Sequence, residues 1–179
     1  MTREPTSRAV GTFVLRDGRH VTLAQPRTED GAAVASFIAD HDGARADLYA
    51  RARTAADGSA ALVAHGPDRG PVIGFIAFAP SGELAGVVAP AFRGVGLGTL
   101  LVHEAAGRAA AMGLRTLHVD LHPGSEDIAE MLRDAGLATV WNIDYPVAHV
   151  TLDVGGERPG WATPRPAPAS VRRNPPPRG

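Results

Sequence analysis

The chain contains no cysteine and no lysine, and all 18 of its basic residues are arginine. The absence of cysteine excludes disulfides, thiolate metal sites and a cysteine nucleophile. The absence of lysine excludes a phosphate-binding loop of the Gly-Lys-Ser/Thr type. No apolar run approaches the roughly 18 residues that a membrane span needs, and the polar N-terminus carries no secretory signal. We therefore expect a cytoplasmic protein that does not contact a membrane.

The 179 residues suffice for one domain with a sizeable core. Hydrophobic residues make up 44% of the chain and charged residues 21%, which is typical of a globular protein. The formal net charge of -1 predicts no general affinity for nucleic acid. An arginine-only set of bases with abundant Ala, Gly and Pro indicates a GC-rich genome.

The composition changes near the C-terminus. Residues 155–179 hold seven of the 15 prolines, five arginines and a single acid. Such a segment cannot bury enough apolar surface to fold, so we predict a disordered tail there. The predicted organisation is a flexible N-terminus over residues 1–10, one folded domain over residues 11–154, and the Pro/Arg-rich tail.

Hydrophobic periodicity and turn residues predict alternating strands and helices in the folded part. Asp17-Gly18 predicts a hairpin turn, and Thr28 and Ser125 are expected to cap helices. The expected strands are 12–15, 20–24, 60–64, 72–79, 84–88, 117–121 and 147–152, with a further strand around Val140. The expected helices are 28–38, 44–55, 97–112 and 126–134. A crossover joins the strands before and after the helix at 97–112, so these two strands should run parallel. The predicted fold is therefore α/β (α+β), with a mixed, mostly antiparallel sheet of six to seven strands and helices on both faces.

A glycine-rich loop precedes the helix at 97–112. Gly94, Gly96 and Gly98 alternate along it, so the backbone is unobstructed and its amides can converge on an anion at the helix N-terminus. Arg93 adds a cation beside them. A diphosphate is the ligand that this pattern favours.

Two other interpretations of the loop remain weaker. A dinucleotide fingerprint, G-x-G-x-x-G, fails in both registers, because Thr99 or Leu101 occupies the third glycine position, although Asp120 stands about where the ribose-binding acid would. A plain glycine-rich turn without a ligand is the second alternative.

Arg93, Gly96 and Gly98 fill every fixed position of the pattern R/Q-x-x-G-x-G/A. The aromatic residue before the arginine and the segment 132–137 extend the match. In these features, over about residues 11–153, the chain resembles the GNAT superfamily of N-acetyltransferases. Residues 15–18 and 27–30, and Glu83 ten positions before the motif arginine, resemble the bacterial protein-lysine acetyltransferases of the Pat type.

The resemblance implies acetyl-CoA as the acyl donor, bound between the strand at 84–88 and the following helix. The implied coenzyme-binding residues are Gly86, Val87, Val88, Arg93, Gly94, Val95, Gly96, Leu97, Gly98 and Thr99. The resemblance implies Glu83 as the catalytic base. Asp120 is the rival candidate, because His118, Asp120 and His122 share one polar face of the next strand. A metal on these three residues is not expected.

The resemblance also implies an amine acceptor, a protein lysine or a small molecule, bound around residues 37–53. Direct transfer is expected, since no cysteine can carry the acyl group. The chain departs from many superfamily members in lacking a tyrosine in the helix at 126–134, and Tyr145 has no supported role. A non-catalytic acyl-CoA sensor is therefore the alternative function. We expect a monomer or a homodimer that does not bind nucleic acid.

Overall fold

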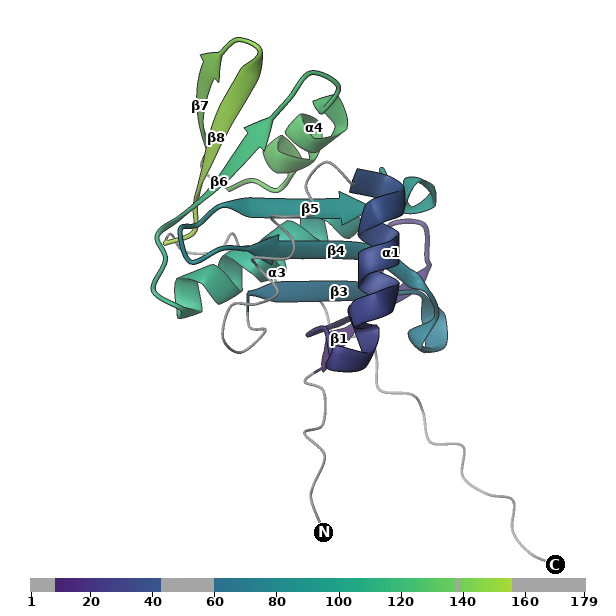
Figure 1. Ribbon diagram of the computed structural model, residues 1–179. Helices are drawn as coiled ribbons and strands as arrows, with labels where there is room; N and C mark the ends of the chain where they lie inside the picture. Colours follow the sequence, from purple (N-terminus) through teal and green to yellow (C-terminus); the bar gives the residue numbers. More distant parts are fainter. Residues whose placement is uncertain (1–8, 43–59, 138, 156–179) are drawn as a thin grey trace, which may run out of the picture.

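The computed structural model describes residues 9–42, 60–137 and 139–155 (Figure 1). The predicted helix at 44–55 and nearly all of the predicted tail lie outside the described residues. The first strand begins at Ala9, before the predicted domain boundary at residue 11. Within the described residues, no helix is long and apolar enough to cross a membrane.

Five antiparallel strands form the larger sheet, and they are neighbours in the order in which they follow one another in the chain. The Asp17-Gly18 turn joins the first two strands as predicted, and Gly18 has a φ of 84°. The alternation of apolar residues and the turns rich in Gly and Pro place all five within a few residues of their predicted positions. They are β1 (Ala9–Val14), β2 (His20–Ala24), β3 (Ala61–His65), β4 (Val72–Phe78) and β5 (Leu84–Val88).

The remaining strands, β6 (Thr116–Leu121), β7 (Thr139–Asp144) and β8 (Val147–Asp153), form a separate antiparallel sheet in the order β6-β8-β7. One parallel bridge between Glu83 and His118 joins the two sheets, and the His118 amide donates to the Gly82 carbonyl at 2.8 Å. The predicted fold class is confirmed, but the described strands form two sheets of five and three where one sheet of six to seven was expected. The expected parallel pairing of β5 with β6 is present, but only at this bridge.

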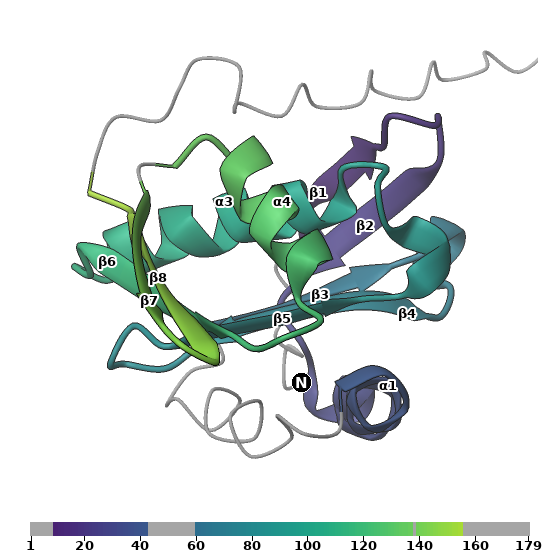
Figure 2. The same ribbon diagram turned by 90° about the horizontal axis from the view of Figure 1, so that it is seen from above.

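Helices cover both faces of the larger sheet (Figure 2). On one face lies α1 (Gly31–Asp42), whose Val34, Phe37 and Ile38 are buried. On the other face lie α3 (Leu97–Ala111) and α4 (Glu126–Asp134). The described residues also contain three short 3-10 helices: η1 (Thr28–Asp30), η3 (Pro67–Arg69) and η4 (Pro90–Phe92).

Two hydrophobic clusters follow from this arrangement. One contains Leu84 together with the buried residues of α3, β6 and β8, and the other contains Ala85 and Val87 together with those of α1. Fully burying a large apolar side chain such as Phe75 contributes about 1.5–3 kcal/mol to folding. Alternate residues of β5 therefore belong to different clusters, which defines an α3 side and an α1 side of the sheet.

The two predicted helix caps differ from the structure. Thr28 is the first residue of η1, and the capping position belongs to Arg27, whose amide donates to the Asp30 carboxylate at 2.7 Å. The prediction failed because this 3-10 turn separates Thr28 from the start of α1. Ser125 does stand at the N-cap of α4, but its side chain makes no capping hydrogen bond; its carbonyl instead accepts from Ile128.

Candidate functional site

The strands β5 and β6 start together at the Glu83–His118 bridge and then diverge (Figure 1). A cleft of about 700 Å³ occupies the gap between them. Its lining residues come from both sides of the larger sheet. Leu101 of α3 lies on one side, whereas His41 of α1 and the Val87 side chain of β5 lie on the other. The cleft therefore reaches both faces of the sheet through the gap.

The edge of β5 that faces the gap offers main-chain groups to the cleft. The Ala89 amide donates to the Ile73 carbonyl at 2.9 Å, and the Ala79 amide donates to the Glu83 carbonyl at 2.8 Å. Main-chain groups alternate in direction along an antiparallel strand. Val87 therefore faces β4, whereas Gly86 and Val88 face the gap. Of the three residues predicted to offer main-chain groups, Val87 contributes only its side chain to the cleft wall.

The glycine loop forms the entrance to the cleft on the α3 side. Gly96 is the N-cap of α3, with a φ of 96° that favours glycine. Gly98 lies so close to α4 that a Cβ atom there would collide with the Met131 sulfur. The Leu100 amide donates to the Gly96 carbonyl at 3.0 Å, and helix geometry leaves the amides before Leu100 without a partner inside the helix. Amides in this position and the helix dipole are features that favour a bound anion.

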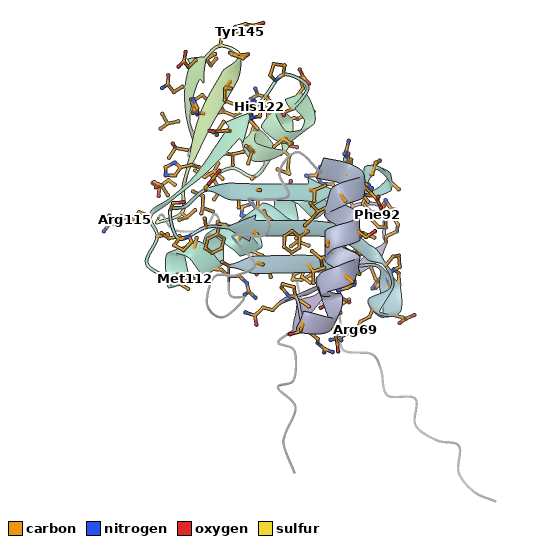
Figure 3. All side chains as sticks on the ribbon, viewed as in Figure 1. Arg69, Phe92, Met112, Arg115, His122 and Tyr145 are labelled. Atoms are coloured by element: carbon orange, nitrogen blue, oxygen red, sulfur yellow. The ribbon has the colours of Figure 1, made fainter. Side chains whose placement is uncertain are left out.

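The turn of the β1–β2 hairpin holds this loop from outside. The Arg16 amide donates to the Val95 carbonyl at 3.1 Å. Arg19 donates to the Ala91 carbonyl at 2.8 Å, and its guanidinium lies 3.9 Å from the centre of the Phe92 ring. Figure 3 shows Phe92 near the end of β5, where the loop begins. The hairpin therefore braces both the start and the middle of the loop.

A carboxylate fixes Arg19 in turn. The Asp17 carboxylate accepts from the Arg19 amide at 3.1 Å and pairs with its guanidinium. Desolvation raises the pKa of Asp17, but the hydrogen bonds and the charge of Arg19 outweigh it and hold the pKa below its ordinary value of 3.8. This ion pair lies within the hairpin turn and keeps Arg19 directed at the loop.

Two further arginines line the cleft at the loop. Arg93, the arginine of the motif, donates from its Nε to the Val88 carbonyl at 3.3 Å, which folds its side chain back onto β5. Arg16, the second of these arginines, comes from the hairpin turn, and its side chain lies against Gly96. The sequence motif contains Arg93 but not Arg16, because only the folded hairpin brings Arg16 to the loop.

On the α1 side, His41 lines the cleft. Its Nδ1 lies 2.9 Å from the Phe37 carbonyl, and its ring is tilted against the Phe37 ring at a centroid distance of 4.5 Å. A carbonyl only accepts hydrogen bonds, so Nδ1 carries the proton and Nε2 of the neutral ring is an acceptor. No pattern in the sequence singles out this residue.

The two predicted bases lie beside the cleft rather than in its wall. Glu83 directly precedes β5 and stands two positions before Ala85. Side chains two positions apart on a strand share a face, so Glu83 lies on the α1 side. Asp120 is exposed on the polar face of β6, which also turns to the α1 side because Leu117 and Val119 pack against the α3 side. Among the described residues, neither of the two acids lines the cleft.

Asp120 has a partner that the sequence did not reveal. Its carboxylate lies 2.7 Å from Nδ1 of His149, which faces it across the β6–β8 pair. Its neighbour His118 contacts Thr151 and Thr116 at 3.4 Å. In the described part of the chain, no group of three or more His, Cys, Asp or Glu side chains is arranged to hold a metal ion.

The sequence matches a family model described as "Acetyltransferase (GNAT) family" over residues 27–151. The chain belongs to the GNAT acetyltransferase family. It is therefore an acyl-CoA-dependent acetyltransferase, as the resemblance implied. No curated protein matches this chain at a significant level.

Solved structures share this fold at low sequence identity. The GNAT domain of S. lividans PAT is 20% identical with a TM-score of 0.60, and the match covers 84% of this chain and 99% of that domain. The diaminobutyrate acetyltransferase EctA of Paenibacillus lautus, solved with L-2,4-diaminobutyric acid and coenzyme A, is 15% identical with a TM-score of 0.60 over 80% of this chain and 100% of that one. Salmonella typhimurium yncA, solved with its cofactor acetyl-CoA, is 16% identical with a TM-score of 0.56 over 75% and 94%.

The GNAT fold brings most of the predicted coenzyme-binding residues to the cleft. Those that line it are Gly86, Val87, Val88, Arg93, Gly94, Gly96, Gly98 and Thr99. Leu97 instead buries its side chain in the core, and the Val95 carbonyl accepts from Arg16. Tyr145 is 90% exposed at the tip of the β7–β8 hairpin, away from the cleft (Figure 3).

Proposed function

We propose that this GNAT protein transfers the acetyl group of acetyl-CoA directly to a primary amine of a protein lysine or a small molecule. The observation that carries the proposal is the cleft between β5 and β6, which extends from the glycine loop on the α3 side to His41 on the α1 side. The coenzyme enters from the loop, and the amine approaches from the α1 side.

The glycine loop binds the diphosphate of the coenzyme through its main chain. The amides from Val95 to Thr99 surround the N-terminus of α3, where the helix dipole favours negative charge. The pantetheine arm then continues along β5, where Gly86 and Val88 offer main-chain groups as an added strand would. The Val88 amide polarises the thioester carbonyl, which supplies the donor that a developing oxyanion needs.

The reaction needs a group that takes a proton from the attacking amine. As the amine nitrogen bonds to the acetyl carbon and the carbon–sulfur bond breaks, Glu83 accepts the proton, directly or through water. Its position on the α1 side, at the point where β5 and β6 begin to diverge, supports this role. The coenzyme thiolate takes its proton from water, since Tyr145 lies away from the cleft.

Release of the coenzyme thiol tests the proposal. Purified protein with acetyl-CoA and a panel of primary amines, from small diamines to lysine-containing peptides, should release thiol with at least one amine. Glu83→Gln should lower kcat about 100-fold, within the range for loss of a general base, and leave coenzyme affinity unchanged. Glu29→Gln, at an exposed acid, is the matched control. Acetyl-CoA binding without turnover on any amine would contradict the proposal and favour an acyl-CoA sensor.

A further inference from the structure

The second arginine at the glycine loop, Arg16, comes from a part of the chain that the family motif does not contain. It belongs to the turn between β1 and β2, and it lines the same cleft as Gly94 and Thr99. We infer that Arg16 binds the diphosphate of the coenzyme, so that the β1–β2 hairpin forms part of the coenzyme site. This inference rests on the proposed coenzyme site.

The position of the Arg16 side chain carries the inference. The place that a Cβ of Gly96 would occupy lies 3.6 Å from Arg16 Nε, 3.7 Å from its Cγ and 3.8 Å from its Cδ. Gly96 is the N-cap of α3, where the anion site lies. The Arg16 amide is tied to Val95 at 3.1 Å, so the main chain holds the side chain beside the loop amides.

The neighbouring arginines are already committed to protein contacts. Arg19 pairs with Asp17 and donates to the Ala91 carbonyl, and Arg93 donates to the Val88 carbonyl. Arg16 is exposed, and within the described part of the chain no carboxylate forms an ion pair with its guanidinium. Its charge is available for an anion in the cleft.

Two acidic residues that also line the cleft make the positive charge of Arg16 important for anion binding. Glu130 and Asp134 of α4 line the cleft, and their carboxylates disfavour a second anion nearby. A planar guanidinium offers paired donors that match phosphate oxygens, which a point charge does less well. The positive charge of Arg16 therefore offsets the negative charge of these two acids. Its guanidinium also adds directional hydrogen bonds to those of the loop amides.

The test compares two ligands on the same variants. Titration calorimetry gives Kd for coenzyme A and for dephospho-coenzyme A, which keeps the diphosphate but lacks the 3′-phosphate. Arg16→Ala should weaken both ligands by about tenfold, as expected for one lost phosphate contact, and Arg16→Lys should restore part of the affinity. Arg115→Ala is the control, because Arg115 is exposed at the end of the sheet opposite Phe92 (Figure 3).

Each outcome bears on the inference. Equal affinity of Arg16→Ala and the wild type for coenzyme A overturns it while leaving the proposed function in place. A loss that disappears with dephospho-coenzyme A overturns it as well, because the arginine then binds the 3′-phosphate. An equal loss in Arg16→Ala and Arg16→Lys shows a structural role and also overturns it. If the wild type binds neither ligand, the proposed coenzyme site itself fails.

Discussion

The main-chain amide of Arg16 donates a hydrogen bond of 3.1 Å to the carbonyl oxygen of Val95. This bond joins the turn of the first hairpin to the glycine loop, which follows about 80 residues later in the sequence. The loop is therefore held at both its ends by structure: the hairpin and η4 fix its start, and α3 fixes its last residues. Because the loop is already ordered, a diphosphate that binds there loses less free energy to ordering the loop.

Gly96→Ala should weaken coenzyme binding by about tenfold or more. A side chain at a φ of 96° is strained by about 1–2 kcal/mol, and relaxing that strain turns the loop amides away from the anion. Calorimetric titration with coenzyme A measures the change. Gly66→Ala is the control, since Gly66 has a φ of -61° and its added Cβ would make only ordinary contacts. Equal affinity in both variants would show that the loop conformation does not matter for binding.

Asp17→Asn should weaken coenzyme binding by about threefold at most, because an exposed ion pair makes only a modest contribution to the position of its partners. The amide keeps the shape of Asp17 but loses the charge that directs Arg19 at Ala91 and Phe92. The same calorimetric titration detects the loss. An unchanged affinity would mean that the hairpin holds the loop without this pair.

The contribution of Asp17 to stability should depend on pH with a defined sign. Its pKa is lowered in the folded protein, so the folded state favours the carboxylate. The stabilisation is fully present above the ordinary pKa of 3.8 and is lost as the pH falls through the lowered value. Urea unfolding of the wild type and Asp17→Asn between pH 3 and 7 should therefore show a difference that shrinks only at the acidic end. A difference that grows on acidification would contradict this assignment.

Asp120→Asn should lower kcat by less than about fivefold, in contrast to Glu83→Gln. The Asp120 carboxylate is held by His149 at 2.7 Å, so its oxygens orient an imidazole on the polar face of the second sheet. Comparing kcat for the two variants with the same amine decides between the two acids. A loss of about 100-fold in Asp120→Asn with a near-normal Glu83→Gln would move the base role to Asp120.

Leu132→Ala should lower the free energy of unfolding by about 3 kcal/mol, within the range for a large side chain removed from a core. Leu132 is 1% exposed, and it attaches α4 to the main hydrophobic cluster at the wall of the cleft. Urea denaturation measures the loss, with Ile143→Ala as the control because Ile143 is 76% exposed. Similar small losses in both variants would show that α4 packs loosely.

The sequence predicted the local elements of this fold well where a strong pattern had clear boundaries. The strand Leu84–Val88 and the helix Glu126–Asp134 match their predicted limits, because apolar periodicity ends there at Pro, Gly or Ser. Thr28 was assigned wrongly, since a cap cannot be distinguished from the start of a 3-10 turn by residue type alone.

Residues that reach the site through tertiary structure were not predictable in the same way. Arg16 comes to the loop because β1 and β2 form a hairpin beside α3, and His149 reaches Asp120 only through the register of β6 and β8. His41 lines the cleft because α1 packs against the larger sheet. Each of these three residues lies far in the sequence from the part of the structure that it reaches. Periodicity and motif spacing therefore carry no signal for them.

A crystal structure of the protein with bound coenzyme A tests the central claim most directly. The account predicts that the diphosphate lies within hydrogen-bond distance of the amides from Val95 to Thr99. It also predicts that the pantetheine arm lies between β5 and β6, against the main-chain groups of Gly86 and Val88. Coenzyme bound outside the gap between these strands, or a pantetheine arm that does not contact β5, would contradict the account.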